Sequence, residues 1–343
     1  MQINLAIDAM GGDLGPRTNI AGALLALLQD PLLSITLVGN KEQLQTLLLQ
    51  HHLSREFAER IHVLASDQVI GMDEAPASVL RNRKNSSMHL AIQLVAQGQC
   101  QGVVSGGNTG ALMLISRHYL GMLPGIERPA ISTAIPTYKG RTYLLDLGAN
   151  IDCQPEHLLQ FALMGSVMVS RVEGQAQPKV ALLNVGHEAI KGNSLVKGAS
   201  ALISQHPNLN YVGYIEGDKI FNGEVDLVVC DGFTGNIALK TSEGLARYLS
   251  GQIQDLFHKN LYSRLVGLMA RPLLHRLKQQ MDPVRYNGGS FLGLQGCVVK
   301  SHGNADAKGF SYAILRAANE ARQGLANHLE AATQHLHSTH EKR

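Results

Sequence analysis

The chain has 343 residues, of which 45% are hydrophobic, so it is long enough to bury a sizeable core in one large α/β unit or in two lobes. The net charge of +3, the 5% share of aromatic residues and the lack of tryptophan argue against a protein that stacks on nucleic-acid bases. The four cysteines lie far apart in the sequence, which argues against a metal site or a disulfide scaffold and fits a reducing cytoplasm.

The first residues contain no basic region followed by a long apolar run, and no stretch of 18 or more apolar residues occurs later in the chain. We therefore expect neither a secretory signal peptide nor a membrane-spanning helix. The expected location is the cytoplasm, with at most peripheral attachment to a membrane surface.

Short apolar runs alternate with amphipathic helical stretches along most of the chain. This βαβ rhythm predicts a three-layer α/β/α fold with a mostly parallel sheet. One interruption, residues 130–147, predicts an antiparallel hairpin of the kind that often forms an arm or a sheet edge. The predicted parallel strands cover residues 3–9, 35–39, 61–65, 102–105, 180–185, 211–215 and 225–230.

The chain shows no repeat and no long linker, so we expect one α/β domain over residues 1–330. Residues 173–178 are the possible boundary between lobes, and residues 251–282 are expected to form a helical protrusion. Residues 331–343 lack strong apolar periodicity and are expected to form a flexible tail. A metal site built from His335, His337 and His340 of that tail is the less favoured alternative.

The most informative motif is the run Ser-Gly-Gly-Asn-Thr-Gly-Ala at residues 105–111, which ends one predicted strand and opens a helix. Backbone N–H groups at such a junction bind anions, and residues 86–115 contain no acidic side chain that would repel one. The expected ligand is a phosphate or an acyl phosphate. The candidate binding residues here are Gly107, Asn108, Thr109 and Gly110.

Further Gly-rich turns follow other predicted strands, at residues 8–16, 146–150, 184–188 and 231–236. Each alone could be ordinary turn chemistry. Together, at the ends of strands where an α/β sheet forms its ligand crevice, they predict a shared site.

These ordered motifs resemble the bacterial phosphate acyltransferases of phospholipid synthesis, the PlsX family, from the N-terminus to about residue 320. The resemblance implies transfer of a fatty acyl group from acyl carrier protein to inorganic phosphate, which gives acyl phosphate. It also implies a homodimer, a fold akin to the isocitrate and isopropylmalate dehydrogenases, and no required cofactor. The alternatives are an acetyl- or butyryltransferase that uses acyl-CoA, a nicotinamide-dependent dehydrogenase on the related fold, and a non-catalytic membrane scaffold.

Acyl transfer to phosphate needs no serine or cysteine nucleophile, because a thioester is already activated and phosphate is itself the nucleophile. The site has to hold the anion near the carbonyl carbon and stabilise the oxyanion. Lys191 and Asn236 are the expected catalytic residues, although Lys191 could also be a solvated lysine; the resemblance favours the functional role. Asp231 is expected to belong to the same catalytic group and to orient one of these two; the alternative is an Asx turn. The other expected residues are Gly232, Gly235, Asn184 and His302 for substrate binding and Asp8, Asp146 and Asn150 as their supports.

Two basic segments lie outside these motifs. Arg81, Arg83 and Lys84 predict a docking surface for an acidic carrier protein, the alternative being a solvated helix end. Residues 253–281 combine an apolar helical stripe with a basic face, a pattern that anionic membranes attract and that also suits a subunit interface. The membrane contacts expected there are Leu268, Met269, Arg264 and Arg271.

Overall fold

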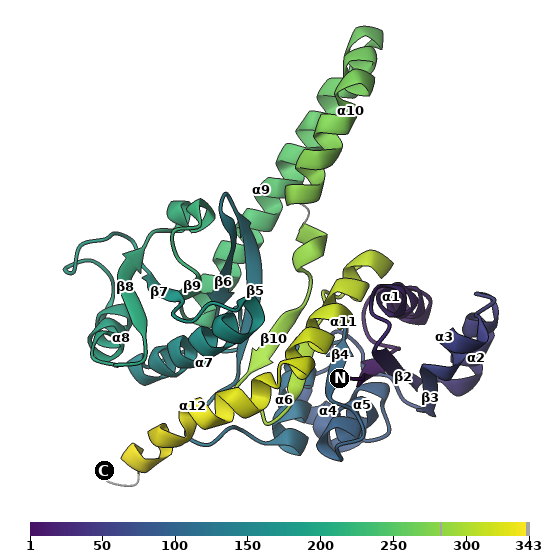
Figure 1. Ribbon diagram of the computed structural model, residues 1–343, viewed down its shortest axis with the longest axis horizontal. Coiled ribbons are helices and arrows are strands. Elements are labelled where there is room, and N and C mark those ends of the chain that lie inside the picture. The colour runs from purple at the N-terminus through teal and green to yellow at the C-terminus, as the bar shows by residue number, and fades with distance from the viewer. Residues whose placement is uncertain (282, 341–343) are drawn as a thin grey trace.

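The computed structural model describes the backbone of residues 1–281 and 283–340 and the side chains of residues 1–274 and 284–334. Its centre is an 11-stranded sheet with the order β3-β2-β1-β4-β11-β10-β5-β6-β9-β7-β8 (Figure 1). The strands are β1 (Ile3–Asp8), β2 (Leu33–Gly39), β3 (Ile61–Ala65), β4 (Gly102–Ser105), β5 (Ala130–Thr137), β6 (Gly140–Leu145), β7 (Lys179–Leu183), β8 (Asn210–Ile215), β9 (Leu227–Val229), β10 (Gly289–Leu292) and β11 (Cys297–Lys300).

The sheet consists of two parallel halves that run in opposite directions. Strands β3, β2, β1, β4 and β11 are parallel, and so are β6, β9, β7 and β8. Between them, the pairs β11/β10, β10/β5 and β5/β6 are antiparallel, so the direction reverses three times. The predicted hairpin is confirmed as β5 and β6, but it lies in the middle of the sheet and not at an edge, because β10 and β9 pair with its outer sides.

Helices cover both faces of the sheet, which confirms the predicted α/β/α layers. One face packs against α5, α6 and the start of α9, while the other packs against α1 and α11 in the first half and α7, α8 and α12 in the second. The helices are α1 (Gly15–Gln29), α2 (Lys41–Leu49), α3 (Arg55–Glu59), α4 (Pro76–Asn82), α5 (Ser87–Ala96), α6 (Thr109–Leu120), α7 (Pro155–Glu173), α8 (Ser194–Ser204), α9 (Gly232–His258), α10 (Leu261–Met281), α11 (Ala307–Arg322) and α12 (Leu325–His340), with the 3₁₀ turns η1 (Gly217–Asn222) and η2 (Pro283–Tyr286).

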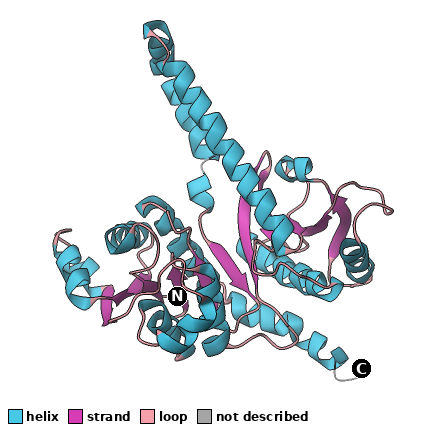
Figure 2. Cartoon of the chain, turned by 180° about the vertical axis from the view of Figure 1, so that it is seen from behind, coloured by secondary structure: helices cyan, strands magenta, loops and turns pink. Residues whose placement is uncertain are grey.

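Helices α9 and α10 form a hairpin that projects from the body of the molecule (Figures 1 and 2). The expected protrusion began at residue 251, yet α9 begins at Gly232. Asp231 caps its first turn, and no proline lies between Asp231 and Pro272, so one helix runs from the sheet to the hairpin tip.

Two expectations about organisation differ from the structure. Residues 174–178 join α7 to β7 within the second half of the sheet, so they do not separate the halves. The expected tail is helical as far as His340, and its helix α12 packs on α7 through Leu325 and Leu329. Residues 341–343 and the side chains of His335, His337 and His340 lie outside the described residues.

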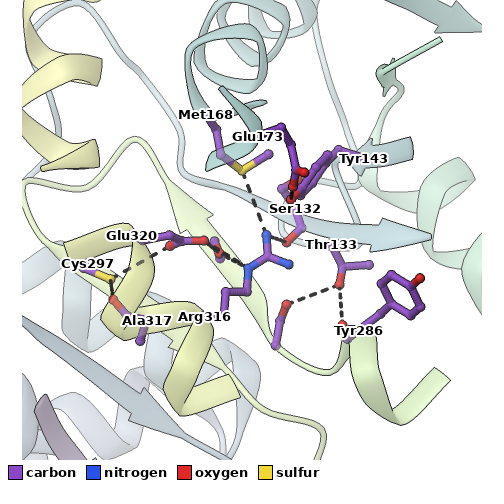
Figure 3. Close-up of polar contacts among 12 residues, drawn as sticks. Ser132, Thr133, Tyr143, Met168, Glu173, Tyr286, Cys297, Arg316, Ala317 and Glu320 are labelled. Carbon is purple, nitrogen blue, oxygen red and sulfur yellow. Dashed lines mark hydrogen bonds and ion pairs between the residues drawn. The ribbon is translucent and has the colours of Figure 1, made fainter. Parts of the chain in front are cut away.

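A polar network joins the two halves on the face covered by α7 and α11 (Figure 3). Arg316 of α11 donates from Nε to Ser290 Oγ at 2.7 Å and to Glu320 Oε1 at 3.0 Å, and from Nη2 to the Ser132 carbonyl at 3.3 Å. Ser290 also donates to Glu320. Because β10 and β5 carry the serines, this buried ion pair ties α11 to the strands at which the sheet reverses.

Candidate active site

The first group of polar residues stands in one row across the sheet. Asp8, Ser105 and Lys300 are the last residues of β1, β4 and β11, and the register pairs Asp8 with Ser105 and Ser105 with Lys300. Side chains in one row of parallel strands point to the same face. Here that face is the one covered by α5 and α6.

Asp8 organises the turn that follows β4. Its buried carboxylate accepts hydrogen bonds from the hydroxyls of Ser105 and Ser87, both at 2.6 Å, and Ser105 Oγ accepts from the Gly107 N–H at 3.0 Å. Burial raises the pKa of Asp8, although these hydrogen bonds favour its charged form. Asp8 therefore supports the turn through Ser105.

Asn108 caps α6 and is occupied by structural contacts. Its side-chain oxygen accepts from the Ala111 N–H at 3.0 Å, while its amide donates to the carbonyls of Met72 at 2.8 Å and Glu74 at 3.0 Å. The groups left for an anion are therefore the first-turn N–H groups of the helix, including those of Thr109 and Gly110, and the exposed Thr109 side chain. A Cβ on Gly110 would lie 2.8 Å from Pro76 Cγ, which explains the glycine.

Cations surround this turn. Lys300 Nζ donates to the Gly106 carbonyl at 3.2 Å, and Lys240 Nζ of α9 lies 3.1 Å from His302 Nε2. Burial and the neighbouring Lys240 lower the pKa of His302, so the neutral ring accepts from the ammonium group. We call Asp8, Ser105, Gly107, Asn108, Thr109, Gly110, Lys300 and His302 the α6 cluster.

The second group lies at the start of α9. Asp146 follows β6, is fully buried, and accepts hydrogen bonds from the N–H groups of Ile131 (2.9 Å), Leu147 (2.6 Å) and Asn150 (2.7 Å). The Asn150 side chain donates to Asp146 at 2.9 Å and to the Pro129 carbonyl at 2.8 Å. Asp146 and Asn150 thus fix the loop at residues 146–150.

Two glycines let α9 approach this loop. A Cβ on Gly235 would lie 1.9 Å from the Asp146 carbonyl oxygen, and one on Gly232 would lie 2.6 Å from the Asn150 carbonyl oxygen. The same close packing brings Asn236 beside Gly148. We call Asp146, Asn150, Asp231, Gly232, Gly235 and Asn236 the α9 cluster.

Asp231 caps α9, which corresponds to the turn alternative and not to the orienting role expected from the sequence. Its carboxylate accepts from the Thr234 N–H at 2.9 Å and from the Thr234 hydroxyl at 2.7 Å. Both oxygens are thereby engaged with Thr234, so Asp231 supports the start of α9 and does not orient Lys191 or Asn236 directly.

A cavity of about 540 Å³ borders the α9 cluster, lined in part by Asn184, Asn193 and Asp231. Asn184 donates to the carbonyls of Gly186 at 3.1 Å and Lys191 at 3.4 Å, which holds the loop after β7. In that loop the half-exposed Lys191 ammonium lies 2.9 Å from Glu188, and this hydrogen bond raises the pKa of Lys191.

The strand ends carry two clusters, one at the start of α6 and one at the start of α9. The two clusters belong to halves of the sheet whose strands run in opposite directions. Helix α9 connects them, because it starts in one cluster and reaches the other through the Lys240–His302 contact. The sequence did not single out Ser87 or Lys300; the strand-end position of Lys300 was the available signal.

The basic segment borders the α6 cluster. Arg83 Nε lies 3.1 Å from Glu74, whose carbonyl accepts from Asn108, while Arg81 and Lys84 are exposed. At the far end of α9, Leu268, Met269, Arg264 and Arg271 are all exposed on α10. The exposed apolar residue nearest the hairpin tip is however Leu261, at the first position of α10.

No group of three or more His, Cys, Asp or Glu side chains is arranged to hold a metal ion in the part of the chain that the structure describes.

Comparisons with known proteins agree with the resemblance. A family model described as "Fatty acid synthesis protein" matches residues 3–328. A phosphate acyltransferase of Pseudomonas paraeruginosa is 52% identical over 333 residues, which cover 97% of this chain and 98% of the relative. A phosphate acyltransferase of Alkalilimnicola ehrlichii is 49% identical and covers 97% of each chain.

Solved structures share the fold at low sequence identity. A phosphotransacetylase from Streptococcus pyogenes has a TM-score of 0.63 at 17% identity and covers 94% of each chain. A 4-hydroxythreonine-4-phosphate dehydrogenase from Klebsiella pneumoniae has a TM-score of 0.53 at 15% identity and covers 94% of this chain and 98% of its own. From the sequence matches, the chain belongs to the fatty acid synthesis protein family of phosphate acyltransferases, the PlsX family, and is an acyltransferase.

Proposed function

We propose that the protein transfers a fatty acyl group from acyl carrier protein to inorganic phosphate and releases acyl phosphate. The observation that carries this proposal is the start of α6, where unpaired first-turn N–H groups lie beside Lys300, Lys240 and His302 in a phosphate acyltransferase chain. Backbone donors next to cations are suited to holding a phosphate.

In the proposed reaction a phosphate oxygen attacks the thioester carbon and forms a C–O bond. The C–S bond then breaks. The carrier leaves as a thiolate and takes up a proton. Asn236 and Lys191 are proposed to stabilise the oxyanion that develops on the carbonyl, and Asp146 and Asn150 support the loop on which Asn236 packs. Phosphate is proposed to bind at Thr109 and Gly110, while Gly107, whose N–H donates to Ser105, shapes the turn before them.

The proposed carrier surface is formed by Arg81, Arg83 and Lys84. Its position supports the proposal, because Glu74 joins Arg83 directly to the loop that Asn108 braces. A carrier bound there would present its acyl thioester at the rim of the α6 cluster, and charge attraction to an acidic partner would speed docking.

We further propose that the α9–α10 hairpin pairs with a second copy of the chain and touches an anionic membrane with its tip. The shaft of α9 exposes Leu245, Tyr248 and Leu249, an apolar stripe suited to a partner helix. The tip exposes Leu261 and Tyr262, and Arg264 follows. Within the described residues, no helix is long and apolar enough to cross a bilayer, so this attachment would be peripheral.

An acyl-CoA donor is the second candidate, favoured by the structural likeness to the Streptococcus pyogenes phosphotransacetylase. The purified protein should be incubated with phosphate and either a fatty acyl carrier thioester or the same acyl group on coenzyme A. Acyl phosphate is trapped with hydroxylamine and quantified. Product from the carrier thioester at a higher kcat/KM than from acyl-CoA supports the proposal; the reverse order supports the alternative. A parallel assay for nicotinamide reduction tests the dehydrogenase hypothesis.

A further inference from the structure

Lys300 is a partly buried cation beside the start of α6. It ends β11, and the register places its side chain in the same row as Ser105 and Asp8. Its Nζ donates to the carbonyls of Gly106, at 3.2 Å, and of Ser301. The ammonium group therefore connects β11 to the turn that leads into α6, next to the backbone hydrogen bond from the Ser301 N–H to the Ser105 carbonyl.

The charges around Lys300 come from every neighbouring element. Asp8 on β1 and Asp13 in the loop after β1 favour its charged form, whereas Lys240 on α9 opposes it. His302, two residues farther along the chain, is neutral because its own pKa is lowered. Removal from water is the largest effect and lowers the pKa of Lys300 to about 8.

We propose that Lys300 is the positioning residue for the phosphate: it fixes the Gly106 carbonyl, and its charge offsets the buried Asp8 carboxylate beneath the α6 cluster. A phosphate dianion at the start of α6 lies near Asp8, and without a compensating cation the two negative charges would repel each other. The Gly106 peptide precedes the turn that presents the N–H groups of α6. Release of its carbonyl would let those groups turn away from the anion.

This inference rests on the proposed phosphate site and is tested by substitution of Lys300→Met, which keeps the length of the side chain and removes its charge. Lys41→Met, at the exposed start of α2, is the matched control. The KM for phosphate is measured at saturating acyl donor, the KM for the donor at saturating phosphate, and phosphate binding to the free protein by calorimetry. Circular dichroism confirms folding.

We expect Lys300→Met to raise the KM for phosphate about tenfold or more, the loss of one charge-assisted interaction. The KM for the acyl donor should stay unchanged. The ratio of the phosphate KM of Lys300→Met to that of the wild type should fall towards one as the pH rises through about 8, because the wild-type lysine then loses its proton. The same ratio for Lys41→Met should stay near one throughout.

A folded Lys300→Met protein with wild-type phosphate KM overturns the inference, and so does an equal rise in both KM values, which is the mark of a purely structural role. If the variant does not fold, the test is made on the wild-type protein. A phosphate affinity that does not weaken between about pH 8 and about pH 9.5 then overturns the inference. The variant Asn108→Ala distinguishes a wrong role for Lys300 from a wrong location of the phosphate site. If both variants bind phosphate normally, the proposed site is wrong; if only Asn108→Ala loses binding, Lys300 alone is excluded.

Discussion

The absence of a side chain at Gly235 allows the close packing that positions Asn236. Its Cα approaches the carbonyl oxygen of Asp146 so closely that a Cβ would lie 1.9 Å away, with Cys230 Sγ at 2.8 Å. Neither neighbour can move freely, because Asp146 is held by several hydrogen bonds and Cys230 is buried. The contact fixes the angle at which α9 leaves the sheet.

We expect Gly235→Ala to lower stability by about 2 kcal/mol or more, in the range of overpacked core substitutions, and to abolish transfer. The measurement is urea unfolding combined with the hydroxylamine assay. Gly244→Ala is the control within the same helix, because a Cβ there meets no atom within 4 Å. It should leave activity intact and raise stability by up to about 1 kcal/mol. Equal stability of the two variants would contradict the close approach.

Lys191 lies on the surface, so its removal should affect the reaction more than the fold. The Lys191–Glu188 pair is half-exposed and contributes little to stability. If its charge stabilises the transition state, Lys191→Met should lower kcat by about 100-fold. The exposed Lys197→Met is the control. Unchanged turnover of Lys191→Met, with an unaltered melting temperature in both variants, would remove Lys191 from the mechanism.

Helix α5 carries a buried histidine beneath the α6 cluster. His89 Nδ1 lies 2.9 Å from Ser86 Oγ, while its Nε2 is buried without a hydrogen-bond partner. Burial, aided by His118 and Lys84, lowers the pKa of His89 to about 4. The folded protein thus binds this proton less readily than the unfolded chain does.

Stability should therefore decrease as the pH falls below the unfolded histidine pKa of about 6.5 and should level off near the folded value, with a total loss of about 3 kcal/mol. Urea unfolding at about pH 7 and about pH 4.5 measures it. His89→Gln should reduce the difference between the two pH values, whereas the exposed His51→Gln should not. A slope that survives in His89→Gln would assign the effect to other groups.

At the scale of elements, local patterns predicted nine of the eleven strands, including the β5–β6 hairpin, and the glycine turns, because these depend on neighbouring residues. Strands β10 and β11 were not predicted. The sequence could not predict that β10 would insert between β11 and β5. That pairing joins Ser290 to Ser132, residues far apart in the chain, and it lies between the two parallel halves of the sheet. The position of Lys300 could not be predicted for the same reason, because its pairing with Ser105 depends on the tertiary arrangement of β11 and β4.

For the whole molecule, the α9–α10 hairpin offers a test that separates its two proposed partners. Leu261→Glu with Tyr262→Glu changes the tip, whereas Leu245→Glu with Leu249→Glu changes the shaft. We expect the tip variant to stay dimeric and lose binding to anionic vesicles, and the shaft variant to become monomeric. Vesicle co-sedimentation and analytical ultracentrifugation provide the measurements.

Wild-type vesicle binding should also weaken with added salt, since each basic residue near the surface contributes about 1 kcal/mol that ions screen. Leu268→Glu with Met269→Glu lies between tip and shaft on α10. Release of this variant from vesicles without dissociation of the dimer would extend the lipid contact to these residues. If the tip variant still pellets with vesicles, or if it dissociates, the hairpin tip does not bind lipid.

The uninterrupted helix α9 also sets the distance between the candidate active site and the hairpin tip. The 22 residues that follow Asn236 in α9, at about 1.5 Å each, make a rod of about 33 Å between Asn236 and the tip. If the tip rests on a bilayer, the acyl transfer takes place that far above the lipid, where a carrier protein can approach freely from the aqueous side. The proposed acyl phosphate product would then have to cover the height of the rod to reach the bilayer.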